Sequence, residues 1–152
     1  MKARKSWICS IRLSIRPNET EVGMAKNILV VDDEQEVLDV MAEMLNSLGY
    51  LCSGVKQGSE ALKLAKEIKF DLVITDLIMP QMGGLVFAKR LRRREKDIPI
   101  IVTAGVNLNK SKIDLEKYGV NDFIRKPFFI EEIEKKLDEL LNKSQALAMS
   151  HK

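Results

Sequence analysis

The sequence predicts an α/β fold: a doubly wound, five-stranded parallel sheet with helices packed on both of its faces. Three observations lead to this fold class. From residue 27 onward, short runs rich in β-branched residues alternate five times with stretches that have apolar residues at helical spacing. Three of the runs are almost wholly apolar, which is typical of strands that are covered on both faces. No internal repeat interrupts the alternation, so a single domain accounts for the pattern.

Short apolar runs bounded by polar residues mark the five strands in order. The first, third and fourth runs contain almost only apolar residues, so we place these strands in the middle of the sheet. The predicted strands cover residues 28–32, 50–55, 72–75, 98–103 and 122–124.

A helix is predicted after each strand. In the first helix the apolar residues stand three or four positions apart, and in the last they form one stripe. Gly58 and Ser59 are a start signal for the second helix, whereas Gly49 and Gly119 stand where the first and fourth helices should end. The predicted helices cover residues 35–48, 58–68, 84–94, 109–118 and 128–141.

The composition is that of an ordinary globular protein, and it excludes several classes. Of the 152 residues, 45% are hydrophobic and 31% are charged, and no apolar run approaches the ~20 residues that span a bilayer. The two cysteines form no disulfide framework and favour a reducing compartment, so we expect a cytoplasmic location without membrane attachment. Outside the first 23 residues the charges balance, which argues against a nucleic-acid partner.

The two ends of the chain differ from the middle. Residues 1–24 are basic and lack a sustained period. We expect a disordered tail or a misassigned start, since Met24-Ala25-Lys26 stands directly before the first strand; the alternative is a short basic segment that binds a membrane or a partner. They also lack the apolar core and cleavage site of a signal peptide. We therefore assign residues 25–142 to the domain and residues 143–152 to a polar C-terminal tail without an output domain.

Polar residues follow four of the predicted strands. Asp32 and Asp33 follow the first, Asp76 the third, Thr103 ends the fourth, and Lys126 comes just after the fifth. Ligands of open parallel sheets bind at this carboxyl edge, so these side chains should converge. Taken singly, the carboxylates could be helix caps or turn residues.

Capping and turn formation do not account for the three carboxylates as a set. They would repel one another unless a cation compensates their charge. Oxygen ligands without His or Cys suit Mg²⁺, with Mn²⁺ as a substitute. Together with a hydroxyl and an ammonium group, they are the parts of a phosphoryl-transfer site whose product is an aspartyl phosphate.

Residues 25 to about 142 resemble the receiver domain of two-component response regulators. Four motifs carry the resemblance in the same order along the chain: Ile28-Leu29-Val30-Val31-Asp32-Asp33-Glu34, Asp76-Leu77-Ile78-Met79-Pro80-Gln81-Met82-Gly83-Gly84, Thr103-Ala104 and Phe123-Ile124-Arg125-Lys126-Pro127-Phe128. The resemblance implies a stand-alone, flavodoxin-like receiver with five helices around a sheet of strand order 2-1-3-4-5.

By this resemblance Asp76 is the phosphoacceptor. Asp33, Asp76 and the backbone carbonyl of Ile78 would bind Mg²⁺ directly, and Asp32 would act through a metal-bound water. Lys126 and Thr103 would contact the phosphoryl group, and Phe123 would fill the space that Thr103 leaves on switching. The family's Lys-Pro peptide bond is usually cis, which makes Pro127 a candidate for a cis proline.

The resemblance also implies partners. A sensor histidine kinase or a histidine phosphotransfer protein would donate the phosphoryl group, and the face made by the fourth helix, fifth strand and fifth helix would bind a downstream protein. A homodimer is compatible with the family. The domain would catalyse its own phosphorylation and dephosphorylation but would be a signalling switch, not a turnover enzyme.

Two other classes share this topology. A phosphatase with an aspartate nucleophile would need an acid two residues after it, where this chain has Ile78. A flavin-binding electron carrier would need a phosphate-cradling loop after the first strand, where this chain has acidic residues.

In the receiver family, the residues two positions after the phosphoacceptor and two positions after the threonine flank the path by which water reaches the phosphoryl group. In this chain they are Ile78 and Gly105. Ile78 adds apolar bulk and cannot orient water, and Gly105 has no side chain to block or assist. We therefore expect a comparatively long-lived phosphoprotein that is shielded mainly by Ile78, unless that side chain simply packs on its own loop.

Overall fold

The computed structural model describes residues 7–8, 25–105 and 114–150. Its sheet has the strand order β1-β3-β2-β4-β5-β6. The strands are β1 (Trp7–Ile8), β2 (Asn27–Val31), β3 (Leu51–Val55), β4 (Leu72–Asp76), β5 (Ile100–Ala104) and β6 (Asp122–Arg125). The five predicted strands correspond to β2–β6, and all of them are parallel. Counted from β2 as the first, their order in the sheet is 2-1-3-4-5, so the predicted sheet and its strand order are confirmed.

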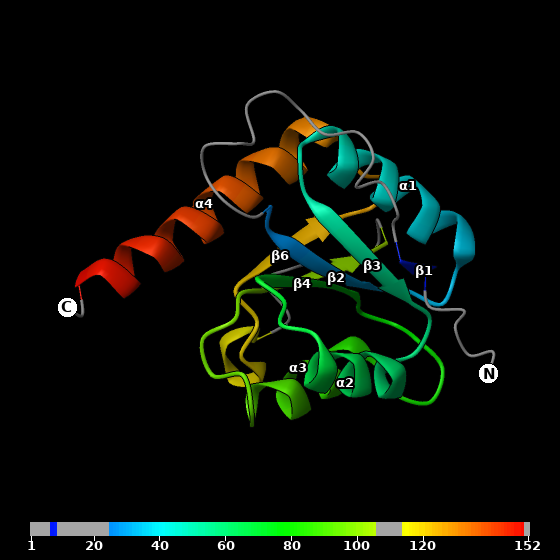
Figure 1. The fold of residues 1–152 in the computed structure, drawn as a ribbon. Coiled ribbons are helices and arrows are strands. Elements are labelled where there is room, and N and C mark those ends of the chain that lie inside the picture. Colours follow the sequence, from blue (N-terminus) through cyan, green and yellow to red (C-terminus); the bar gives the residue numbers. More distant parts are fainter. Residues whose placement is uncertain (1–6, 9–24, 106–113, 151–152) are drawn as a thin grey trace.

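Helices cover both faces of this sheet. They are α1 (Gln35–Ser47), α2 (Gly58–Glu67), α3 (Gly84–Arg92), a short 3₁₀ helix η5 (Glu116–Tyr118) and α4 (Ile130–Ser150). Figure 1 shows α1 and α4 on one face of the sheet and α2 and α3 on the other. Two separate apolar cores follow from this arrangement: one contains Leu38, Met41 and Leu137, and the other contains Phe87 and Leu91.

The sequence did not predict β1. Trp7 and Ile8 lie antiparallel to Gly54 and Ser53 of β3, the outer strand of the parallel sheet. The outer edge of such a strand offers unpaired backbone groups to any nearby segment, which explains why so short a strand can pair there. The rest of the expected tail, residues 1–6 and 9–24, lies outside the described residues.

The helices differ from the prediction at two places. Of the predicted helix at 109–118, residues 109–113 lie outside the described residues, and the described part forms only η5, which ends at the left-handed Gly119 (φ 76°). Helix α4 continues to Ser150, past the predicted boundary at residue 142. The sequence of its last turns contains Lys, Gln, Ala, Leu and Met, which have high intrinsic helix propensity.

No helix within the described residues combines the length and the apolar character that a membrane span requires.

Candidate functional site

The three predicted carboxylates meet at the carboxyl edge of the sheet. Asp32 and Asp33 directly follow β2, and Asp76 is the last residue of the neighbouring strand β4. One carboxylate oxygen from each of the three residues lies within 4.8 Å of the others. Asp32 is 1% exposed and Asp76 is 9% exposed, whereas Asp33 faces solvent. The prediction that these side chains converge is therefore confirmed.

Strand register explains how Thr103 and Lys126 reach the same place. Thr103 of β5 stands beside Asp76 of β4, and the Leu77 N–H donates to the Thr103 carbonyl at 2.8 Å. The Lys126 N–H donates to the carbonyl of Ala104 at 2.7 Å, so the lysine begins directly beside the end of β5. The peptide bond between Lys126 and Pro127 is cis, as the resemblance led us to expect.

The Lys126 ammonium group is shared by two carboxylates. Its Nζ lies 3.1 Å from Oδ2 of Asp32 and 3.4 Å from Oδ1 of Asp76. The other carboxylate oxygen of Asp32 accepts a hydrogen bond from the Glu34 N–H at 2.9 Å, which fixes the orientation of this buried group. Because both partners of Lys126 are largely buried, these ion pairs are screened less than surface pairs.

The electrostatics of the site favour an additional cation. Burial and the neighbouring Asp32 raise the pKa of the Asp76 carboxyl group above its ordinary value, and Lys126 offsets only part of this. Burial alone would lower the pKa of Lys126, but the Asp32 and Asp76 carboxylates outweigh it and hold that pKa above its usual value. The single positive charge of the Lys126 ammonium group therefore does not balance the negative charges of the three clustered carboxylates.

The ligand set fits Mg²⁺. The cluster offers only carboxylate oxygens, which a hard divalent cation prefers, and Asp33 opens it to solvent, so metal-bound waters have room. The bound cation would supply charge neutralisation for phosphate oxygens.

A close backbone approach holds Asp76 in place. Helix α3 begins at Gly84, whose N–H donates to the carbonyl of Leu77 at 2.8 Å. A Cβ at Gly84 would lie 2.1 Å from the carbonyl oxygen of Asp76, so only glycine fits there. The sequence contains this glycine in the second motif, but its role depends on a distance that the sequence does not show.

The other predicted site residues differ in their burial. Thr103 and Phe123 are buried, and Phe123 belongs to the core beneath α2 and α3. The Ile78 side chain is 73% exposed, so packing on its own loop does not account for it. Gly105 is exposed, with open space where a side chain would stand.

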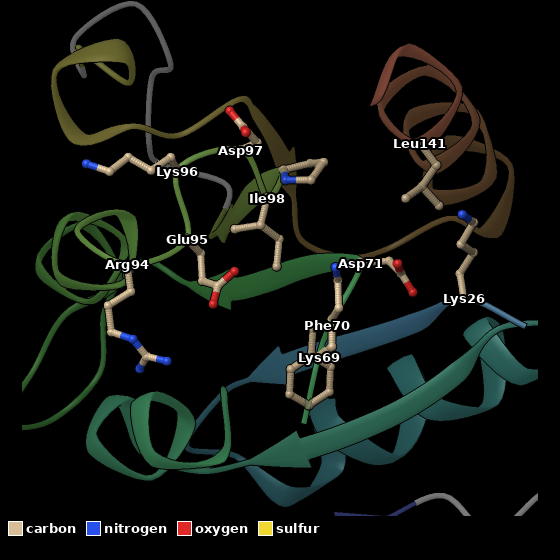
Figure 2. Close-up of a pocket in the computed structure, with 11 residues that line it drawn as sticks. Lys26, Lys69, Phe70, Asp71, Arg94, Glu95, Lys96, Asp97, Ile98 and Leu141 are labelled. Carbon is tan, nitrogen blue, oxygen red and sulfur yellow. The ribbon is translucent and has the colours of Figure 1, made fainter. Parts of the chain in front are cut away.

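A second concave region lies at the opposite, amino edge of the sheet (Figure 2). This groove of about 560 Å³ is formed by the segments that lead into β2, β4 and β5 and by α4. Its charged lining residues are Lys26, Lys69, Asp71, Arg94, Glu95, Lys96 and Asp97. The groove is separate from the carboxylate cluster and contains none of the predicted site residues.

Arg92 holds one wall of this groove together. Its guanidinium group donates to the carbonyls of Glu95, Lys96 and Ile98 at 3.1, 3.1 and 2.6 Å. It also donates to the carbonyl of Gly119 at 2.5 Å, which connects the loop before β5 to the turn before β6. Sequence reasoning missed this role, because a single arginine in a basic run gives no signal of it.

The parallel sheet and its carboxylate cluster define a class of phosphoacceptor signalling domain. Residues 28–138 match the response regulator receiver domain family. The chain belongs to this family, and the domain is a signalling module, not a turnover enzyme.

Curated relatives agree with this assignment. The chain is 32% identical over 127 residues to the alkaline phosphatase synthesis transcriptional regulatory protein PhoP of Bacillus subtilis, a match that covers 84% of this chain and 53% of that protein. It is 40% identical over 105 residues to the CAI-1 autoinducer sensor kinase/phosphatase CqsS of Vibrio cholerae, covering 67% of this chain and 15% of CqsS. The chain spans about half the length of PhoP and of three further transcriptional regulators that it matches.

Solved structures show the same fold. The chemotaxis protein CheY4 of Vibrio cholerae has a TM-score of 0.73 and 29% identity, covering 78% of this chain and all of that one (100%). The receiver domain of the sensor histidine kinase PA1611 of Pseudomonas aeruginosa, described with a magnesium ion in its active site cleft, has a TM-score of 0.71 and 27% identity, covering 78% of this chain and 99% of that one.

Proposed function

We propose that this domain is a phosphorylation switch in which Asp76 accepts a phosphoryl group. The observation that carries the proposal is the position of the Asp76 carboxylate, at the end of β4, within 4.8 Å of two other carboxylates and 3.4 Å from the Lys126 ammonium group. An Asp76 oxygen would attack the phosphorus atom of the donor. The bond from phosphorus to the donor's leaving group would break, and an aspartyl phosphate would remain.

The surrounding residues support distinct roles in this step. Asp32 and Asp33, with Asp76 and the backbone carbonyl of Ile78, would hold Mg²⁺. The Lys126 ammonium group already lies beside Asp76 and would bind a phosphoryl oxygen once the group is transferred. Thr103, beside Asp76 in the sheet, would donate its hydroxyl group to the phosphoryl group, and Phe123 would move into the space that Thr103 leaves.

Receiver domains interact with histidine kinases. We propose such a kinase, or a histidine phosphotransfer protein, as the donor, and the cytoplasm as the place where the two meet. The downstream partner would bind the face that contains η5, β6 and α4, because β6 leads directly to Lys126 at the phosphorylation site.

Chemical phosphorylation tests the assignment of Asp76. With Mg²⁺ and acetyl phosphate, the purified chain should gain the mass of one phosphoryl group, measured by mass spectrometry of the intact protein. Asp76→Asn should abolish the gain, whereas Asp97→Asn, an exposed carboxylate at the other edge of the sheet, should keep it. An undiminished gain in the Asp76 variant would show that another residue is the acceptor.

The lifetime of the phosphorylated form tests the role of Ile78. Its exposed apolar side chain follows the phosphoacceptor by two residues and would keep water from the line of attack. We expect Ile78→Asn to lose the phosphoryl group several-fold faster than the wild type, followed by decay of the purified phosphoprotein. Val40→Asn, which alters another exposed apolar position, on α1, should decay like the wild type. Unchanged or slower decay in Ile78→Asn would refute the shielding role.

A further inference from the structure

Two helices on opposite faces of the sheet carry charges of opposite sign. Helix α1 contains three acidic residues and no basic one, whereas α3 contains three basic residues and no acidic one. Two further arginines, Arg93 and Arg94, directly follow α3. The nearly neutral total charge of the domain therefore hides two helices of opposite charge.

At each helix, three exposed charges and one exposed valine form a stripe. The acidic stripe on α1 consists of Glu36, Asp39, Val40 and Glu43. The basic stripe consists of Val86, Lys89 and Arg90 on α3 and of Arg93, the C-cap residue that directly follows it in a helical conformation; all of these residues are exposed. Both sets have the spacing i, i+3, i+4, i+7, which places their members on one side of a helix over about 10 Å. The two stripes thus match in length and are opposite in charge.

The two valines are unusual among the exposed residues. Val40 is 44% exposed and Val86 is 46% exposed, and they are two of the four large apolar side chains that are exposed in the described part of the chain. Burying both valines in a contact between the two stripes would remove apolar surface from water, and charges of opposite sign would face each other in the same contact.

Most of the charges in the stripes have no partner inside the domain. Arg90, Arg93, Glu36 and Glu43 form no ion pair within the described residues. Asp39 accepts a hydrogen bond from Gln35 at 2.9 Å, and the Lys89 ammonium group lies 5.8 Å from the centre of the Tyr118 ring. Both arginines and both glutamates can therefore pair with another molecule without breaking an ion pair of this one.

The stripes of one molecule cannot meet each other. Helix α1 packs on the core that contains Leu38 and Leu45, and α3 packs on the separate core that contains Phe87 and Leu91. The sheet lies between the two helices, as Figure 1 shows. A contact between the stripes therefore requires two molecules.

We propose that the basic stripe of one copy binds the acidic stripe of a second copy. The contact is heterologous, because each copy uses α3 on one side and α1 on the other, so that copies add head to tail. A nucleic acid fits this surface less well, since the adjoining groove mixes Asp71, Glu95 and Asp97 with four basic residues and so does not extend the basic stripe into a continuous basic surface. Because the pairs are exposed, the association is weak and sensitive to salt.

Sedimentation velocity of the full chain tests this proposal. At low ionic strength the mean mass should rise with protein concentration, and in about 1 M salt, where the screening length is about 3 Å, the rise should disappear. Reversing the basic stripe (Arg90→Glu with Arg93→Glu) or the acidic stripe (Glu36→Lys with Glu43→Lys) should each leave a monomer. An equimolar mixture of these two variants should associate again, because each then offers the charge that the other lacks.

The controls distinguish this contact from nonspecific association and from binding of nucleic acid. Lys63→Glu with Lys66→Glu reverses two exposed lysines of α2 outside the stripes and should associate like the wild type. Circular dichroism confirms that each variant is folded. A wild type that stays monomeric at every concentration, or a mixture that does not associate, would overturn the proposal. So would binding of double-stranded DNA that depends on Arg90 and Arg93 in a chain that does not self-associate.

Discussion

The two edges of the sheet both gather charged side chains, but they do so in different ways. At the carboxyl edge, the charges of Asp32 and Asp76 are buried and share one ammonium group from Lys126. At the amino edge, the groove is lined by charges such as Arg94, Lys96 and Asp97, which are exposed.

This difference shows that charge alone does not make a reactive site. Buried charges interact strongly because little water screens them, whereas exposed charges at similar density contribute little. The carboxyl edge buries its charges because adjacent strands end there in register and α3 starts against the backbone of Asp76. The amino edge leaves its lining charges exposed and depends on the hydrogen bonds of Arg92 to hold its loops.

The substitution expected to disrupt the carboxyl edge most is Gly84→Ala, because it affects the packing of α3 against the backbone of Asp76. The new Cβ would lie 2.1 Å from the Asp76 carbonyl oxygen, so the start of α3 or the end of β4 must move. We expect a loss of about 3 kcal/mol in the free energy of unfolding, together with loss of phosphorylation. Urea denaturation measures the first effect. Gly105→Ala places a Cβ in open space and should change neither quantity; equal effects of the two substitutions would contradict the close-approach argument.

The corresponding test of the amino edge is Arg92→Ala. This change removes five hydrogen bonds to the loop before β5 and the turn before β6. We expect a loss of about 2 kcal/mol in the free energy of unfolding, because partly buried carbonyls lose a charged donor. Arg92→Lys should recover only part of it, since an ammonium group cannot reproduce the planar fork of arginine. The exposed Arg94→Ala should have almost no effect, and a similar loss there would mean that hydrogen bonding is not the cause.

The smallest expected effect is a gain in stability, whereas the two substitutions above lower it. The raised pKa of Asp76 means that folding favours its protonated form. The stability that this provides is complete below the ordinary aspartate pKa of about 3.9 and is lost as the pH rises through the higher pKa of the folded state. At pH 7 without metal, Asp76→Asn should therefore melt a few degrees above the wild type, and the gap should close near pH 4.

Thermal melts in a chelator measure this gap, and Asp97→Asn at the amino edge should show none. A wild type more stable than Asp76→Asn at pH 7 in the chelator would refute the electrostatic account. Adding Mg²⁺ should stabilise the wild type more than Asp76→Asn, because the variant lacks one of the three carboxylates.

The sequence predicted the parallel sheet and the convergence of Asp32, Asp76 and Lys126, because apolar runs locate strands and parallel strands bring their ends to one edge. It could not predict distances such as the one that requires Gly84, because these depend on how elements pack. A strand of two residues such as β1 has too little sequence for a periodic signal. The domain limits of 25 and 142 stay predictions, although the family match covers residues 28–138 and α4 runs past the second limit.

The ion pair between Lys126 and Asp32 has a consequence for the synthesis of the protein. These residues are 94 positions apart, and the lysine directly follows the last strand of the sheet. As the chain leaves the ribosome, the strand with the proposed phosphoacceptor emerges well before the residue that is to bind the transferred group. A partly made chain would therefore contain the acidic residues of the site without the lysine, and we expect that it could not accept a phosphoryl group from a kinase. Competence to accept the phosphoryl group would therefore arise only after the last strand of the sheet and Lys126 have been made.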